Sequence, residues 1–406
     1  MNIVYGCCCG IDVHKGTIVV CLNKGGRQEL RDFGTMTDEL RKLCAWLKDS
    51  RCEMAAMEST ASYWKPLYNL MELNGLEAMV VNAAHMKALP GRKTDIKDAE
   101  WICDLLRHGL LKASYIPDRE QRELREVARY RKSLIEERAR EVNRLSKMLE
   151  GANIKLDSVL SNINGKSSRR VLDHIIAGNE LTAEETAELL HGRIRQNLDQ
   201  VMRAIEGTTT GLQRLLLRQV VDHIDDMTRR IGDMDDIIKG HLQKFEEAIQ
   251  AIDEIPGIGR KSAESIIAEI GIEMCRFPSA SHLASWAGLC PGNNESAGKR
   301  RNGKTTKGNS MLRTTLIECA NSARRVKHSF FCAQFNRISI RRGKNRAVVA
   351  VAHSMLIAIY HILKDNEPYV DLGADYYERF NREKKVSFYL KKLKALGMDT
   401  TALVPC

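Results

Sequence analysis

The stretch that decides the fold runs from Ile3 to Leu22 and reads IVYGCCCGIDV-HKG-TIVVCL. Two apolar, β-branched runs, Ile3–Val13 and Thr17–Leu22, flank the short turn at His14. This pattern predicts a β-hairpin. Asp12 lies at the end of the first run. A carboxylate in such a run is costly to bury unless it is paired or binds a cation, so Asp12 is a candidate functional residue.

The residues that follow alternate between strand and helix patterns. Apolar stretches predict strands over 53–57 and 77–82. Helical spacing of apolar residues predicts helices over 38–48, 62–73 and 95–108, the last with Thr94 as its N-cap. Strands that alternate with helices are typical of a layered α/β domain, which we place at residues 1–117.

The rest of the chain is predicted to be mainly helical. Amphipathic periodicity over 120–150 and 208–249, with a mostly helical connection, predicts two long helices in a region 118–250. We expect these two helices to form a helical hairpin or coiled-coil arm, either within one chain or between subunits. A third region, 251–406, carries a basic stretch and a further helical pattern over 346–363.

Composition excludes several protein classes. The chain has 406 residues, 43% hydrophobic and 28% charged, as expected for a soluble protein of two to three domains. The longest nearly apolar run, Ala347–Tyr360, is shorter than the ~20 residues of a membrane span, and the N-terminus has no secretory signal pattern. The 12 cysteines show no C-x-x-C pair. We therefore expect reduced thiols in a cytoplasmic protein with no membrane partner.

The positive charge is concentrated in one segment. The net charge is +11, but residues 295–346 alone carry +12 and the remainder −1. A local basic patch in a soluble protein most often binds phosphate, which predicts a nucleic-acid partner. A solvated face without a ligand is the alternative.

Four carboxylates form the first candidate site: Asp12, Glu58, Asp95 and Asp98. Glu58 follows a predicted strand, and Asp95 and Asp98 lie three residues apart on one predicted helix face. Such hard oxygen ligands suit Mg²⁺ or Mn²⁺, which assist phosphoryl displacement. Taken singly, each acid also has an ordinary structural explanation: Asp95 suits a helix N-terminus and Glu58 a loop start.

The sequence Ile255-Pro256-Gly257-Ile258-Gly259, followed by Lys261, forms the second candidate. An apolar-Pro-Gly-apolar-Gly turn between helices is typical of helix-hairpin-helix DNA binders, in which backbone N–H groups hold a phosphate. A helix–helix turn without a ligand is the alternative.

Ser296 is the third candidate, because it stands among small residues immediately before three cations. A serine that attacks a phosphodiester needs a base or metal and positive charge on the phosphate oxygens. A flexible loop explains the same sequence. The cations expected to bind nucleic acid here are Lys299, Arg300, Arg301, Lys304, Lys307 and Arg313.

Five motifs in order resemble the DEDD-type bacterial transposases of the insertion-sequence 110 family. They are Gly-Ile-Asp12-Val-His-Lys, Met-Glu58-Ser-Thr-Ala-Ser-Tyr-Trp, Lys-Thr-Asp95-Ile-Lys-Asp98-Ala, Ile-Pro-Gly-Ile-Gly, and Gly-Leu-Cys-Pro-Gly-(x)₃-Ser296-Ala-Gly-Lys. The resemblance covers residues 10 to about 375.

The resemblance implies a RuvC-like N-terminal domain of RNase H type in which Asp12, Glu58, Asp95 and Asp98 bind metal. It implies a mostly helical C-terminal transposase domain in which Ser296 attacks DNA and forms a 5′-phosphoserine link. It also implies a homo-oligomer, a dimer or tetramer, whose metal site and serine come from different subunits. A structured bridge RNA would pair with donor and target DNA at the bacterial nucleoid.

Three functions remain open from the sequence. The first is a transposase or recombinase that uses Mg²⁺ and a serine. The second is a RuvC-like junction-resolving endonuclease that uses only the acids and water. The third is a non-catalytic nucleic-acid-binding protein.

Overall fold

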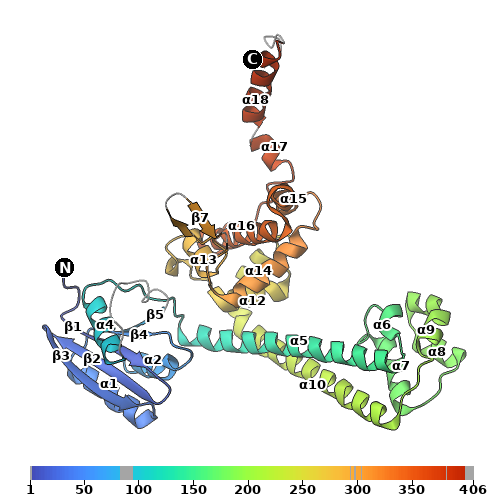
Figure 1. Ribbon diagram of the computed structural model, residues 1–406, viewed down its shortest axis with the longest axis horizontal. Coiled ribbons are helices and arrows are strands. Elements are labelled where there is room, and N and C mark those ends of the chain that lie inside the picture. The colour runs from blue at the N-terminus through green and yellow to red at the C-terminus, as the bar shows by residue number, and fades with distance from the viewer. Residues whose placement is uncertain are drawn as a thin grey trace. The chain divides into compact units, whose positions relative to one another are not determined.

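The computed structural model describes residues 2–82, 95–292, 294–296, 299–302, 304–380 and 382–397 (Figure 1). The chain forms two compact units, Met1–Arg122 and Glu123–Cys406. The division into regions 1–117, 118–250 and 251–406 stays a prediction.

A five-stranded mixed sheet forms the centre of the first unit, in the order β3-β2-β1-β4-β5. Its strands are β1 (Cys7–Val13), β2 (Thr17–Lys24), β3 (Arg27–Gly34), β4 (Met54–Glu58) and β5 (Ala78–Val81). β1, β2 and β3 are antiparallel neighbours, whereas β4 and β5 run parallel to β1. The predicted hairpin and both predicted strands are present. β3 was not predicted, because its residues are mainly polar and exposed.

Helices cover both faces of this sheet (Figure 1). On one face α1 (Thr37–Asp49) and α2 (Trp64–Leu73) pack through Leu43 and Met71 against the odd-numbered residues of β1, such as Ile11. On the other face α4 (Asp95–Arg107) packs through Ile102 against Cys8 and its neighbours. This arrangement is consistent with the RNase H-like α/β domain that the sequence predicts.

The contact of α4 with β1 is unusually close because Gly10 has no side chain. A Cβ atom at Gly10 would lie 2.2 Å from the Ala99 carbonyl oxygen and 2.3 Å from the Cys103 nitrogen. The backbones of helix and strand therefore touch at this point. The predicted helix over 95–108 is present, and its predicted N-cap, Thr94, lies outside the described residues.

Two long helices of the second unit, α5 (Arg119–Gly151) and α10 (Gly211–Leu242), lie alongside each other and antiparallel (Figure 1). Arg131 of α5 pairs with Asp235 of α10, and Arg138 donates to Thr228 seven residues along. Their apolar ends share a core with the short helices that connect them. These are α6 (Leu156–Val159), α7 (Lys166–Ala177), α8 (Ala183–Leu189), the 3₁₀ segment Gly192–Asn197 and α9 (Leu198–Ala204).

The prediction of one long helix over 208–249 is wrong at its C-terminal end, because α10 stops at Leu242. A 3₁₀ turn, Gln243–Phe245, separates it from α11 (Glu246–Asp253). The helices that follow are α12 (Arg260–Ile270), α13 (Ala280–Trp286), α14 (Ser310–Ala323), α15 (Phe330–Arg342), α16 (Lys344–Asp365), α17 (Tyr376–Phe380) and α18 (Arg382–Ala395).

α16 is the core helix of this part of the chain. By length and composition it would suffice to cross a membrane, although the apolar run within it is shorter. In the structure half of its most apolar window is buried, and it packs against α11, α13, α14 and α15. Its fully buried residues include Ala347, Val351, Met355 and Ile359.

The cysteines that the structure describes all carry free thiols, as the sequence analysis expects. Most of them lie in the core of the first unit, where burial raises the pKa of Cys44 to about 11. These side chains therefore act as small apolar core residues.

Candidate functional site

Asp12 and Glu58 point to the same face of the sheet, the face that α4 covers. Side chains alternate along a strand, so Asp12 shares its face with Cys8 and Gly10, and Glu58 shares its face with Ala56. Ile11 of β1 pairs with Met57 of the parallel strand β4. Asp12 and Glu58 each follow by one residue, so the two carboxylates are neighbours on adjacent strands.

The two carboxylates differ in environment. Asp12 is 6% exposed, and its Oδ2 lies 2.9 Å from Nε2 of His14. Glu58 is half-buried and accepts a hydrogen bond from the Thr60 hydroxyl at 3.3 Å. Burial of Asp12 in an apolar strand is stabilised by this polar partner.

The N-terminus of α4 reaches the same edge of the sheet. Its C-terminal end lies at the start of β1, where the Val4 N–H donates to the Arg107 carbonyl at 2.9 Å. Its middle crosses Gly10 at Ala99, so α4 runs antiparallel to β1. The helix start, with Asp98 half-buried, therefore lies toward the end of β1 that carries Asp12.

Among the described side chains, no group of three or more His, Cys, Asp or Glu residues is arranged to hold a metal ion. The side chain of Asp95 and the preceding segment lie outside the described part of the chain. Topology thus directs Asp12, Glu58 and the start of α4 to one edge, and the donor set is hard oxygen, which fits Mg²⁺ or Mn²⁺. The completed four-ligand set stays a prediction.

Ser296 lies in a short β-hairpin of the second unit. It ends β6 (Asn294–Ser296) and pairs with Lys299 at the start of β7 (Lys299–Asn302), while Glu295 pairs with Arg300. A flexible loop was one prediction for this stretch, and strands were not predicted. The orientation of the Ser296 side chain and of Lys299, Arg300 and Arg301 lies outside what the structure describes.

The base of this hairpin is held by backbone and side-chain contacts. Pro291 and Thr305 form an isolated β-bridge, and the Gly292 N–H donates to the Lys304 carbonyl at 2.9 Å. Arg313 donates to the Thr305 hydroxyl at 2.7 Å and also to the Gly288 carbonyl. Arg313, predicted to bind nucleic acid, therefore also fixes the hairpin.

Two glycines allow the segments before and after the hairpin to touch. Gly288 has a φ of +70°, and a Cβ atom on Gly308 would lie 2.3 Å from the Gly288 nitrogen. A side chain at either position would separate the two segments.

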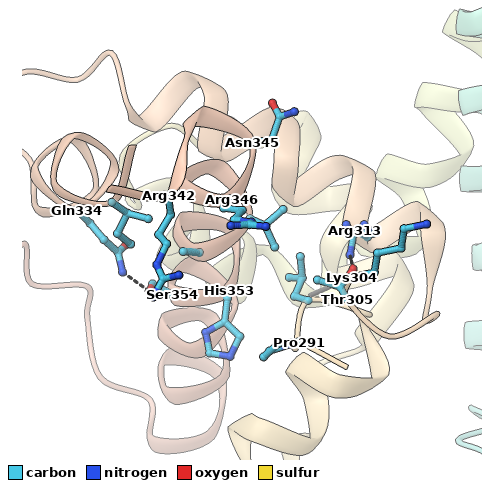
Figure 2. A pocket seen from close by; sticks show the side chains of 14 residues that line it. Pro291, Lys304, Thr305, Arg313, Gln334, Arg342, Asn345, Arg346, His353 and Ser354 are labelled. Carbon is cyan, nitrogen blue, oxygen red and sulfur yellow. Dashed lines mark hydrogen bonds between the residues drawn. The ribbon is translucent and has the colours of Figure 1, made fainter. Parts of the chain in front are cut away.

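A cavity of about 1060 Å³ adjoins the base of the hairpin (Figure 2). Its lining contains four cations, Lys304, Arg313, Arg342 and Arg346. All four belong to the basic segment, whereas the cavity was not predicted from the sequence. Polar residues of α15 and α16 that had no predicted role also line it: Gln334, Asn345, His353 and Ser354.

The predicted Pro-Gly turn joins α11 to α12. Gly257 has a φ of +90°, and a Cβ atom there would lie 2.4 Å from the Ala323 nitrogen, so this glycine is required by packing. Gly259 precedes α12 with extended backbone and open space around it. Lys261, the predicted phosphate ligand, is more than half exposed and pairs with Asp235 at 2.7 Å. Lys307, the remaining predicted cation, is exposed in the segment before α14.

Comparison with known proteins gives two family matches. Residues 9–154 match a family described as Transposase, of DEDD and IS110 type, and residues 249–333 match the Transposase IS116/IS110/IS902 family. The first match contains the four carboxylates, and the second contains the Pro-Gly turn, Ser296 and the hairpin.

Individual relatives are similar over most of the chain. A probable family 20 transposase of Pseudomonas aeruginosa is 24% identical over 87% of this chain and 92% of its own length. The transposase for insertion sequence element IS1111A of Coxiella burnetii is 23% identical over 76% of each chain. A pilin gene-inverting protein of Moraxella bovis is 28% identical over 28% of this chain and 36% of its own length.

Proposed function

The chain belongs to the IS116/IS110/IS902 family of transposases and is the transposase of an insertion element, and we propose that it cuts and rejoins DNA strands with a carboxylate site and a serine nucleophile. The observation that carries this proposal is the shared edge of the sheet. Asp12, Glu58 and the start of α4 approach it from three different elements.

Asp12, Glu58, Asp95 and Asp98 would hold a divalent cation, Mg²⁺ or Mn²⁺. When bound, such an ion supplies positive charge to the oxygens of the phosphate under attack. The protein's own contribution is to direct the carboxylates to one edge. The tight contact at Gly10 fixes α4, and His14 holds the Asp12 side chain in place.

Ser296 is the proposed nucleophile. Its Oγ attacks the phosphorus, the bond to the 3′ oxygen breaks, and the products are a 5′-phosphoserine and a free 3′-hydroxyl. The serine proton passes to a carboxylate, and the leaving 3′ oxygen takes up a proton. A 3′-hydroxyl of the partner strand then attacks the phosphoserine and releases Ser296. The phosphoserine bond keeps the energy of the cleaved phosphodiester bond, so the strands can be rejoined.

The basic segment supports DNA as the substrate, because phosphate binding needs the cations that it concentrates. The name of the Moraxella relative describes gene inversion, which also requires cutting and rejoining of DNA. We further propose, from the family resemblance, a structured guide RNA, a homo-oligomer, and action at the nucleoid in the cytoplasm. The carboxylates and Ser296 belong to different compact units, which is compatible with a site completed by a second subunit.

The test is strand cleavage of DNA that carries the element's ends, analysed on denaturing gels for a covalent protein–DNA product. Ser296→Ala is expected to abolish the adduct and insertion, and Asp12→Asn to abolish cleavage. The matched controls Ser310→Ala and Asp38→Asn change exposed residues of the same types and are expected to stay active.

The same gels separate the alternatives. Cleavage by Ser296→Ala without an adduct would support a junction-resolving endonuclease that uses water. DNA binding without cleavage, unchanged by Asp12→Asn, would support a non-catalytic binding protein. Either result would refute the serine mechanism.

A further inference from the structure

Two chemically distinct kinds of side chain line the cavity beside the hairpin. Cations come from the ends of α15 and α16 and from the hairpin base, and Arg342, Arg346 and Arg313 are labelled in Figure 2. Apolar side chains form the rest of its surface together with a few polar groups, and these include Leu289, Ile338, Val349 and Ala350. A ligand that matches both kinds of side chain carries an anionic group and a largely apolar, hydrogen-bonding group.

The positive charge of the lining is not compensated locally. No acidic residue is among the described side chains that line the cavity. Arg342 and Arg346 are exposed, and neither forms an ion pair with another described residue. A guanidinium in this situation matches the geometry of a phosphate, to which it can donate two parallel hydrogen bonds.

The interior presents hydrogen-bonding groups at fixed positions. Gln334 is 9% exposed, and its Nε2 donates to the Ser354 hydroxyl at 2.8 Å. Its Oε1 is buried and accepts no hydrogen bond from any described residue. Burial lowers the pKa of His353, which favours the neutral imidazole, a form that can both donate and accept. A buried acceptor without a partner is unfavourable until a donor reaches it.

A nucleotide satisfies these requirements. Its phosphate suits the arginines, its base has apolar faces, and the edge of the base carries the N–H donors that Gln334 needs. The cavity volume of about 1060 Å³ is ample for one nucleotide, since typical ligand pockets span ~300–1,000 Å³. Enzymes that modify a DNA base hold the extruded nucleotide in a pocket of this kind.

The cavity also lies close to the proposed nucleophile. Pro291 lines the cavity and Ser296 follows five residues later, so the two are at most ~18 Å apart along the chain. A strand with its phosphate at Ser296 would have a nearby nucleotide within reach of the cavity.

We propose that this cavity holds one unpaired deoxynucleotide of the strand that is cut, with its phosphate on Arg342 and Arg346 and its base against Gln334 and His353. The proposal rests on the proposed function, because it takes DNA as the substrate and Ser296 as the point of cleavage. It adds that a specific nucleotide next to the cleaved phosphate is removed from the base stack.

The test uses 2-aminopurine, a base whose fluorescence rises when it leaves the stack. Synthetic duplexes covering the junction of the element's end with flanking DNA carry it at one position at a time, and the full-length protein is added in metal-free buffer so that no cutting occurs. We expect a several-fold rise at one position beside the cleavage point.

A matched pair of double variants assigns the signal to the cavity. Arg342→Ala with Arg346→Ala removes two cations that line it, whereas Arg341→Ala with Lys344→Ala removes two exposed cations from the same helix ends that do not. Both lower the net charge equally. Only the first pair is expected to abolish the fluorescence rise at DNA concentrations that saturate both proteins.

A single substitution, Gln334→Met, tests the interior separately and is expected to reduce the rise while the arginines are intact. Equal loss in both double variants, or no rise at any position with the unaltered protein, would overturn the proposal. A rise with RNA of the same sequence and none with DNA would also overturn it. Failure of the proposed function is seen separately, as absence of the covalent adduct on denaturing gels.

Discussion

Replacement of Glu269 by alanine is expected to destabilise the second unit strongly. The Glu269 side chain is 1% exposed and lies near the end of α12. Arg129 of α5 binds both of its carboxylate oxygens, at 2.7 and 2.9 Å, and the Asn309 amide donates to Oε2 at 2.6 Å. Hydrogen bonding to Glu269 also raises the pKa of the Arg129 guanidinium. One carboxylate therefore joins three segments that are distant in the sequence.

The magnitude follows from what remains after the substitution. Removing one partner of a buried ion pair costs about 3–5 kcal/mol, because the other charge is left uncompensated. Half of the Arg129 side chain is exposed and can return to water, but Arg125, which lies 3.7 Å from Glu269 Oε2 and is 11% exposed, stays buried, so we expect at least about 3 kcal/mol. For the second unit, residues 123–406, the unfolding entropy of about 2.1 cal/mol/K per residue converts 3 kcal/mol into a fall in melting temperature of about 5 °C.

The assay is urea unfolding followed by hydrogen exchange of peptides from α12, which reports on the second unit alone. The control is Glu273→Ala, which removes an exposed partner of Arg276 and is expected to cost at most about 1 kcal/mol. The double variant Arg129→Ala with Glu269→Ala should be less destabilised than the two single effects combined. Equal stability of the Glu269→Ala and Glu273→Ala proteins would refute the reasoning.

The same substitution should also affect the hairpin. Asn309 caps α14 by accepting from the Leu312 N–H at 3.0 Å, and its own N–H donates to the Trp286 carbonyl at 2.9 Å. These contacts hold the two ends of the segment that carries Ser296. Loss of Glu269 therefore loosens the support of the proposed nucleophile.

Two further predictions concern glycines at close contacts. Gly10→Ala should displace α4, abolish DNA cleavage and remove the native unfolding transition seen by circular dichroism. Gly16 has open space around it, so Gly16→Ala should leave cleavage and the unfolding transition unchanged. Gly257→Ala combines a φ of +90° with a backbone clash against α14, and in urea unfolding it should cost more than about 3 kcal/mol, the upper limit of a strained backbone position without a clash. Gly259→Ala, with extended backbone and no neighbour, should be nearly neutral; equal effects of the two would contradict this account.

Much of the first unit could be predicted from sequence, because its strands and helices carry the expected periods of apolar residues. β3 escaped prediction since it contributes little to the core and its residues, such as Arg27 and Asp32, are those of an exposed surface. The hairpin around Ser296 escaped for the same reason, because Lys299, Arg300 and Arg301 resemble a solvated loop.

The candidate site could be predicted only in part. Asp12 and Glu58 were identified by their residue type. The alternation of side chains along a strand, which can be read from the sequence, places both on one face of the sheet. The cavity could not be anticipated, because its lining combines Leu289, Gln334 and Arg346 from separate elements and no local pattern connects them. The end of α10 at Leu242 was also missed, since the apolar period continues across the break.

The position of α16 in the chain has a consequence for synthesis of the protein. Among the described helices it is the one that is long and apolar enough to cross a membrane, and an exposed helix of this kind promotes aggregation. The helices on which it packs, α11, α13, α14 and α15, all precede it in the sequence. A ribosome therefore delivers α16 after its binding surface, so the nascent helix can be buried as soon as it emerges.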